Sequence, residues 1–273
     1  MCIRDSIWGL VVKLKAPLGT EDILPAQAAL WQRLEAAARE VFARWGYGEI
    51  RTPIFEFTSL FVRSIGEATD VVEKEMYVIG EGDDSLALRP EATASVVRAY
   101  LQANLHKVRA FQKFYYIGPM FRHERPQKAR LRQFHQLGVE AIGAASPLLD
   151  AETILLALDI FRQIGLKRSV LWLNSIGCAE CRPPFRDMLR AALAHHVDQL
   201  CGDCRKRMDT NVLRVYDCKN EGCQAVIQQL PVMTDHLCAQ CAEHYRRVKQ
   251  ALTRAGVQFR EEPRLVRGLS LIH

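Results

Sequence analysis

Residues 114–142 read FYYIGPMFRHERPQKARLRQFHQLGVEAI, and this stretch decides the fold because two strand-like runs enclose a polar turn. The first run begins with FYYI and is bounded by Gly118-Pro119, a composition typical of a buried strand. Residues 123–132 are polar and include Pro126, which favours a loop over a helix. The chain then returns through residues 133–142. The stretch therefore predicts a β-hairpin.

One face of this hairpin combines residue types that suit a nucleotide and an amino group. Strand residues alternate between faces, so the returning strand presents together Phe134, Gln136, Gly138 and Glu140. The same rule places Arg122 and Glu124 together on the outgoing side. A guanidinium can hold a phosphate through two parallel hydrogen bonds, an aromatic ring can stack on a purine, and a carboxylate can receive an ammonium. The alternative is a hairpin with a solvated, charged tip; we favour the binding face because the whole set occurs in one hairpin.

The composition of the whole chain excludes several classes of protein. With 273 residues, 49% apolar and 25% charged, it fits one large or two ordinary globular domains. No run approaches the ~20 apolar residues of a membrane span, and no secretory signal precedes a cleavage site, so we expect no membrane partner. The formal net charge of +6 permits a polyanionic partner without demonstrating one.

Periodicity predicts further elements on both sides of the hairpin. An apolar stripe at helical spacing runs from Leu30 to Trp45, and a short strand over residues 49–53 follows Gly46 and Gly48. A helix is expected over residues 60–74, a second hairpin over 76–88, and a helix over 92–105 that Glu91 begins. The remaining patterns predict helices over 148–164 and 243–255 and a strand over 167–174.

The segment FRHERPQKARLRQFHQLGVE, residues 121–140, resembles motif 2 of class II aminoacyl-tRNA synthetases in the form found in histidyl-tRNA synthetases. Three other segments agree with that family, namely APLGTEDILP (16–25), LRPEATA (88–94) and PRLVRGL (263–269). The resemblance implies an α+β fold, with a class II antiparallel sheet flanked by helices. It also implies that the helix and strand before residue 53 build a homodimer interface; an ordinary amphipathic helix packed on its own sheet is the alternative.

The resemblance implies a role for individual residues. Arg122 and Arg267 would act on the α-phosphate of ATP as catalytic residues, and Mg²⁺ would bridge the phosphates. ATP would be bound by Arg122, Glu124, Arg130 and Phe134. Substrate histidine would be bound by Glu91, Ala92, Thr93, Gln136 and Glu140. From the residues alone, an acid at a helix start such as Glu91 is also explained by the helix dipole.

Eight of the nine cysteines lie close together in the second half of the chain, in four pairs. Three pairs are Cys-x-x-Cys and one is Cys-x4-Cys, a spacing that lets two thiolates reach one tetrahedral ion. We therefore predict two structural zinc sites, with the combination of pairs left open, from Cys178, Cys181, Cys201, Cys204, Cys218, Cys223, Cys238 and Cys241. Unbound thiols and disulfides are the alternatives, and a cytosolic enzyme disfavours disulfides. Four nearby histidines are further possible ligands or ordinary surface residues: His195, His196, His236 and His244.

These observations divide the chain into segments. We expect a tail over residues 1–14, a catalytic core with motifs 1 and 2 over 15–166, and a cysteine-rich inserted domain over 167–256. Residues 257–269 would return to the core, and 270–273 would be a second tail. The family continues Asp-Tyr-Tyr where this chain has Ser270-Leu271-Ile272, and motif 3 and the anticodon-binding domain do not follow. We therefore expect a chain truncated before motif 3 and inactive by itself.

The predicted function of the full-length protein is that of a cytoplasmic histidine–tRNA ligase. It would activate L-histidine with ATP and transfer it to tRNA(His), and the inserted domain would touch the acceptor arm of that tRNA. A synthetase-like regulatory paralogue of an ATP phosphoribosyltransferase is the main alternative. Such paralogues tend to lose the ATP and tRNA contacts, whereas Arg122, Glu124, Arg130 and Arg267 are all present here. A stand-alone zinc module for nucleic-acid binding would explain only the insertion.

Overall fold

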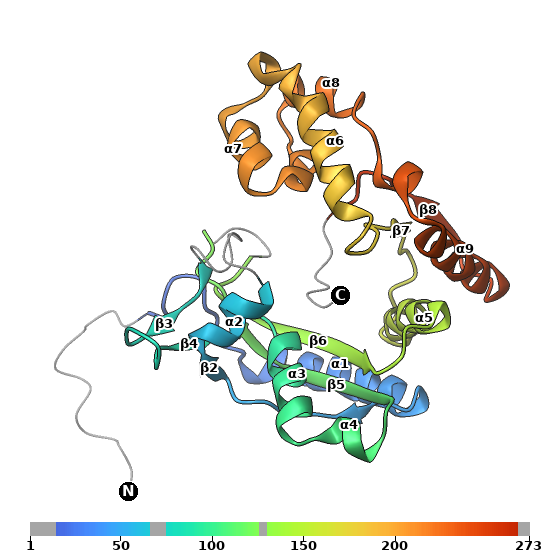
Figure 1. Ribbon diagram of the computed structural model, residues 1–273. Coiled ribbons are helices and arrows are strands. Elements are labelled where there is room, and N and C mark those ends of the chain that lie inside the picture. The colour runs from blue at the N-terminus through green and yellow to red at the C-terminus, as the bar shows by residue number, and fades with distance from the viewer. Residues whose placement is uncertain (1–14, 66–74, 126–129, 267–273) are drawn as a thin grey trace, which may run out of the picture.

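The computed structural model describes residues 15–65, 75–125 and 130–266, and within them the chain has an α+β architecture. Figure 1 shows a lower part, the core, which contains α1 to α4 and β1 to β6. A helical part with the cysteines, here called the cysteine module (residues 178–241), stands apart from it. The elements α5, β7, α9 and β8 lie between the two.

The predicted hairpin forms the centre of the core. Strand β5 (Gln112–Phe121) pairs antiparallel with β6 (Gln133–Ile142) along its whole length. The expectation that Gly118-Pro119 ends the strand was wrong. Within a strand, the nitrogen and oxygen of one residue point to the same side, and the oxygen of Pro119 accepts a hydrogen bond from Arg89. The proline nitrogen therefore faces away from β6, and the ladder continues.

A purely antiparallel sheet does not describe the core completely. Strand β1 (Gly48–Glu49) adds to β5 in parallel, giving the order β1-β5-β6. A second, antiparallel sheet has the order β2-β4-β3 and is built from β2 (Phe55–Phe57), β4 (Leu86–Leu88) and β3 (Val78–Ile79). The predicted second hairpin is thus confirmed, as β3 and β4.

Helices cover both sheets. Helix α1 (Pro25–Arg44) and α5 (Pro147–Gln163) bury apolar residues against the first sheet, where the rings of Phe42 and Tyr115 stack with centroids 4.3 Å apart. Helices α2 (Thr58–Ile65) and α3 (Thr93–Gln102) share an apolar cluster with the second sheet, and α4 (Leu105–Val108) lies beside the beginning of β5. The end of the helix predicted over residues 60–74 lies outside the described residues. Only the second half of the apolar stripe on α1 is buried; Leu30 near its start is 63% exposed.

A small parallel sheet and a helix connect core and module. Strand β7 (Leu171–Leu173) pairs with β8 (Phe259–Glu261), which returns from far along the chain. Helix α9 (Ala239–Arg254) packs against α5 through a shared apolar cluster that includes Tyr245, Val248 and Leu252. The return of the chain beside β7 holds the two ends of the cysteine-containing segment together.

The cysteine module is a set of short helices around its own apolar core. These helices are α6 (Arg182–Ala194), η2 (Val197–Gln199), α7 (Gly202–Thr210), η3 (Val212–Asp217), α8 (Glu221–Ile227) and η4 (Met233–His236). Phe185, Leu189 and Leu193 of α6 are almost completely buried in this core. Among the described residues, no helix has the length and the apolar composition that crossing a bilayer would require.

Candidate active site and cysteine clusters

The segment between β4 and α3 places a buried carboxylate at the start of a helix. Glu91 is 5% exposed, and its carboxylate accepts hydrogen bonds from the backbone N–H groups of Thr93 (2.5 Å) and Ala94 (3.0 Å). Ala92, which precedes the first helical residue, is fully buried. The N-terminal end of α3 thus fixes the Glu91 carboxylate through its otherwise unpaired N–H groups.

A second carboxylate reaches the same place from β6. The Thr93 hydroxyl donates to Glu140 at 2.7 Å, so the hairpin and the start of α3 meet at these two side chains. Burial raises the pKa of Glu140 to about 7; the Thr93 hydrogen bond opposes this rise and the charge of Glu91 adds to it. Burial also raises the pKa of Glu91, against its backbone hydrogen bonds and the charge of Arg122. A buried and a partly buried acid whose pKa values are both raised form a site that favours a cation.

Two glycines in the hairpin make room for large side chains of this pocket. A Cβ at Gly138 would lie 2.2 Å from the Tyr116 ring, and a Cβ at Gly118 would lie 2.5 Å from Nη2 of Arg89. Tyr116 contributes to the pocket electrostatically, because burial and the charges of Glu140 and Glu91 raise the pKa of its hydroxyl. The sequence analysis missed Tyr116 and Arg89; glycines inside a strand were the signal that something approaches the backbone closely.

Arg89 joins three segments of the core. Its guanidinium is buried and donates to the carbonyl oxygens of Pro119 (2.9 Å), Thr52 (3.1 Å) and Pro53 (3.4 Å). The loop between β1 and β2, the loop before α3 and the outgoing strand of the hairpin therefore share one buried cation. Because its hydrogen-bond partners among the described residues are neutral oxygens, Arg89 supports the shape of the site.

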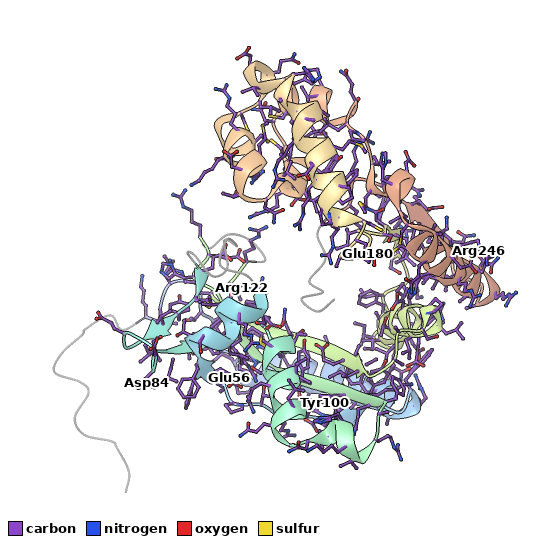
Figure 2. The ribbon with its side chains drawn as sticks, viewed as in Figure 1. Glu56, Asp84, Tyr100, Arg122, Glu180 and Arg246 are labelled. Carbon is purple, nitrogen blue, oxygen red and sulfur yellow. The ribbon has the colours of Figure 1, made fainter. Side chains whose placement is uncertain are left out.

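Arg122, labelled in Figure 2, lies at the end of β5 beside the pocket. Its Nε donates to the carbonyl oxygen of Pro90 at 2.9 Å, and its guanidinium carbon lies 5.2 Å from the centre of the Phe134 ring. The contact with Pro90 uses one of the five N–H groups that a guanidinium carries. The predicted phosphate ligand and the predicted purine platform therefore lie side by side, next to Glu91.

The other predicted nucleotide residues lie toward the tip of the hairpin. Arg130 forms an ion pair with Glu124 at 3.2 Å, and half of the Arg130 side chain is exposed. Gln136 lies opposite Gly118 in the sheet, on the same alternate set of positions as Glu140. Arg267 lies outside the described residues. The structure thus brings together Glu91, Ala92, Thr93 and Glu140, places Arg122 with Phe134 beside them, and pairs Glu124 with Arg130.

A cavity of about 480 Å³ lies between α1 and the start of β6. Trp31 of α1 and His135 line it, with their rings 4.7 Å apart, and Phe134, the predicted purine platform, also lines it. Neither Glu91 nor Glu140 is among its lining residues. The cavity therefore shares Phe134 with the candidate site but does not include the two acids.

The eight cysteines of the module form two groups of four free thiols. The first cluster joins the beginning and the end of the module and consists of Cys178, Cys181, Cys238 and Cys241. The second cluster lies within it and consists of Cys201, Cys204, Cys218 and Cys223. This combination of pairs was open from the sequence. Among the described residues, no histidine is part of either cluster.

The geometry of both clusters fits a tetrahedral metal. Zn–S bonds of about 2.3 Å place the sulfur atoms of a tetrahedral site about 3.8 Å apart. The Sγ atoms of Cys201 and Cys218 are 3.8 Å apart, those of Cys178 and Cys181 are 3.5 Å apart, and all four in each cluster lie within 4.8 Å of one another. The two clusters therefore have the donor type, number and spacing that zinc requires.

Hydrogen bonds to sulfur lower the pKa of one thiol in each cluster, whereas burial raises the pKa of Cys204, Cys223 and Cys241. The backbone N–H groups of Cys238 and Cys201 donate to Cys181 and Cys223, each at 3.1 Å. Burial would raise the pKa of Cys181, but hydrogen bonds from Cys178 and Cys238 hold it at about 6. In the second cluster, the hydrogen bond from Cys204 lowers the pKa of Cys201 to about 7, against burial. Backbone donors of this kind orient and stabilise metal-bound thiolates.

Comparison with known proteins identifies the family of this chain. A family model described as histidyl-tRNA synthetase matches residues 19–257. The chain belongs to the histidyl-tRNA synthetase family. It is 52% identical to a histidine–tRNA ligase of Halothermothrix orenii over 94% of the chain and 61% of that relative. It is also 52% identical to one of Trichlorobacter lovleyi, over 92% of the chain and 60% of that relative. The chain thus spans about 60% of the length of these relatives.

Solved structures of the family agree with the fold. The chain is similar to apo histidyl-tRNA synthetase of Staphylococcus aureus, with a TM-score of 0.71 and 37% identity over 94% of the chain and 58% of that protein. A second structure, described as an ATP phosphoribosyltransferase regulatory subunit/histidyl-tRNA synthetase from Bacillus halodurans, has a TM-score of 0.63 at 18% identity, covering 95% of the chain and 70% of that protein. The second likeness shows the shared fold alone.

Proposed function

We propose that the full-length protein is a histidine–tRNA ligase, which activates L-histidine with ATP and transfers it to tRNA(His). The observation that carries this proposal is the pair of acids, buried Glu91 and partly buried Glu140, linked through Thr93 and placed beside Arg122. An amino acid has an ammonium group for the acids and a carboxylate that can point toward a phosphate next to the arginine. The choice of histidine among the amino acids rests on membership in the histidyl-tRNA synthetase family.

The proposed reaction has two steps. An oxygen of the histidine carboxylate attacks the α-phosphorus of ATP, the bond to the β-phosphate oxygen breaks, and pyrophosphate leaves. A ribose hydroxyl of the terminal adenosine of the tRNA then attacks the acyl carbon, loses its proton and displaces AMP. Mg²⁺ bound to the phosphates would neutralise charge on pyrophosphate.

The residues of the chain contribute mainly position and charge in this proposal. Glu91 and Glu140 hold the ammonium, Thr93 orients Glu140, and Ala92 and Gln136 complete the histidine site. Arg122 would turn its unused N–H groups to the α-phosphate, where negative charge develops in the transition state. Phe134 would stack on adenine, with Glu124 near its edge and Arg130 near the outer phosphates. Arg267 is proposed as the second cation on the α-phosphate.

The ion proposed for both cysteine clusters is Zn²⁺ in a structural role. Four thiolates close the coordination sphere and leave no position for a substrate, so the ions would stabilise the module without taking part in the reaction. The module has an apolar core but is built from short helices, and the clusters join segments that are far apart in the sequence. Metal binding at such sites contributes directly to folding.

The proposed partners follow from exposed surfaces of the core. The outer side of α1 and the segment before it expose Leu18, Leu24 and Leu30, each more than 60% accessible. Apolar area of this kind supports a homodimer through the α1 region. We also propose that tRNA(His) contacts the protein and that the ligase acts in the cytoplasm, where its substrates are present.

Amino-acid-dependent exchange of pyrophosphate into ATP tests this function. The chain would be extended to the length of its relatives and assayed with each amino acid separately. The proposal expects exchange with histidine alone, and loss of exchange in Arg122→Met. Exchange with another amino acid but not with histidine would contradict it. A folded, extended protein that binds an ATP phosphoribosyltransferase and supports no exchange would instead identify the regulatory alternative.

A further inference from the structure

A short segment between β8 and residue 267, here called the strap (residues 262–266), is attached both to the residue that follows β7 and to a helix inside the cysteine module. Next to β7, Asn174 donates from Nδ2 to the carbonyl oxygens of Pro263 (3.1 Å) and Leu265 (2.8 Å). This amide fixes the direction in which the strap leaves the small parallel sheet. A second attachment comes from the module itself.

Arg264 of the strap closes the end of a module helix. Its Nε donates to the carbonyl oxygen of Ile227 at 3.3 Å, and its Nη2 donates to that of Gln228 at 2.8 Å. These carbonyl groups belong to the last residue of α8 and the residue after it, beyond the hydrogen bonds of the helix itself, and the Ile227 oxygen also accepts from the Leu230 backbone N–H at 3.3 Å. A cation at a helix C-terminus is also favoured by the helix dipole. Val266, two residues on, packs against the apolar core of the module.

The same helix carries a ligand of the second cluster. Cys223 lies in the first turn of α8, where Asn220 caps the helix by accepting from the N–H groups of Gly222 (3.0 Å) and Cys223 (3.4 Å). Cys201 donates its backbone N–H to the Cys223 sulfur. One short helix therefore has a cysteine cluster at its beginning and the strap arginine at its end.

We infer that Arg264 is a positioning residue that couples the second cysteine cluster to the strap. With a metal on Cys223, α8 is held in place and presents its last carbonyl oxygens to Arg264. The strap then stays against the module. Without the metal, α8 loses its anchor and Arg264 loses its partners, which leaves the strap attached near β7, through Asn174 and through the backbone hydrogen bond from Glu262 to Leu173. This inference rests on the proposed metal in the second cluster and is independent of the reaction.

Two readouts on the 273-residue chain test the coupling without any activity assay. The chain is loaded with Co²⁺, whose thiolate absorption bands report both clusters, and amide hydrogen exchange is followed in a peptide that covers the strap. In Arg264→Met, we expect exchange in the strap to rise by about tenfold or more while the cobalt spectrum stays unchanged. Arg264→Lys, which can reach one carbonyl oxygen, should give an intermediate rate.

Matched variants separate coupling from general damage to the module. Arg205 donates to the carbonyl oxygen of Leu200 at 2.9 Å within the module, so Arg205→Met should leave strap exchange unchanged. Cys223→Ser should remove one of two cobalt ions and accelerate strap exchange as Arg264→Met does. Unchanged strap exchange in Arg264→Met would overturn the inference. An altered cobalt spectrum in Arg264→Met would also overturn the inference, because Arg264 would then maintain the module itself. Failure of the second cluster to bind cobalt would overturn it as well.

Discussion

The core and the cysteine module both bury groups that favour a cation, but they hold these groups in different ways. In the core, backbone N–H groups at the start of α3 fix Glu91, and the Thr93 hydroxyl holds Glu140. In the module, two groups of four thiols each converge from segments up to 63 residues apart, Cys178 to Cys241. The pocket thus has its geometry before a substrate arrives, whereas the module would, on our proposal, be held by two bound metal ions.

Removal of the metal should give the largest difference in stability between the core and the cysteine module. We expect a strong chelator to unfold residues 178–241 while the core keeps its protection from hydrogen exchange, because structural zinc can contribute ~10–16 kcal/mol to folding. Circular dichroism and hydrogen exchange would follow the change, and elemental analysis should find two zinc ions per reduced chain. Cys2→Ser, which changes none of the eight clustered cysteines, should retain two ions. Protection of the module that survives metal removal would contradict this difference.

Neutralising the best-fixed acid should weaken substrate binding without unfolding the core. In Glu91→Gln, we expect the affinity for L-histidine to fall by ~2–4 kcal/mol, or about 30- to 1000-fold, because the ammonium loses a buried partner. Calorimetric titration measures this change. Asp84→Asn, in the exposed turn between β3 and β4, is the control and should bind as the original chain does. If Glu91→Gln bound L-histidine with the same affinity as the original chain, Glu91 would not contact the ammonium group.

Adding a methyl group at Gly138, beside the acidic pocket, should show how closely the core is packed there. An added Cβ at Gly138 would lie 2.2 Å from the Tyr116 ring, and we expect Gly138→Ala to destabilise the chain by ~1–3 kcal/mol. At Gly48 the nearest atom would be 3.9 Å away, so Gly48→Ala should cost much less. Urea unfolding of the two variants compares them directly. Equal stability of both variants would show that the residues around Gly138 can move to accommodate the added methyl group.

The pH dependence of histidine binding should give the smallest effect. Burial raises the pKa of Glu140 to about 7 from 4.5, so the empty pocket prefers the neutral acid and the folded state loses stability as pH rises from about 4.5 to 7. An ammonium ligand instead requires the carboxylate. Binding should therefore strengthen by about tenfold between pH 6 and pH 8, in proportion to ionised Glu140. The imidazole of the ligand also titrates in this range. The contribution of Glu140 is therefore the part of the pH-dependent change in affinity that Glu140→Gln abolishes. If Glu140→Gln left the pH dependence of affinity unchanged, another group would be responsible for it.

The sequence predicted those parts of the fold that depend on local patterns. Strand composition and a polar turn were sufficient for the hairpin of β5 and β6, and Cys-x-x-Cys spacing was sufficient to suggest metal sites. Which cysteine pairs combine depends on the return of the chain beside β7, which no local spacing encodes. The extension of β5 through Pro119 likewise depends on Arg89, a residue that is close only in the folded chain.

The supporting residues of the pocket were harder to predict than the residues that would touch the substrate. Glu91, Thr93 and Glu140 stand in motifs whose resemblance to the family is specific, and the structure brings them into contact. Arg89 and Tyr116 act through their fit against Gly118 and Gly138, which is a matter of register between distant segments. A glycine inside a strand indicates that something lies close to it, but it does not indicate what.

Recognition of an ammonium group by the Glu91–Thr93–Glu140 pocket is tested most directly by three ligands that differ at one end. The 273-residue chain would be titrated calorimetrically with L-histidine, with histidinol, which keeps the ammonium but lacks the carboxylate, and with imidazolepropionate, which lacks the ammonium. The account predicts that histidine and histidinol bind and that imidazolepropionate does not. Imidazolepropionate binding as tightly as histidine, or histidinol failing to bind, would contradict it.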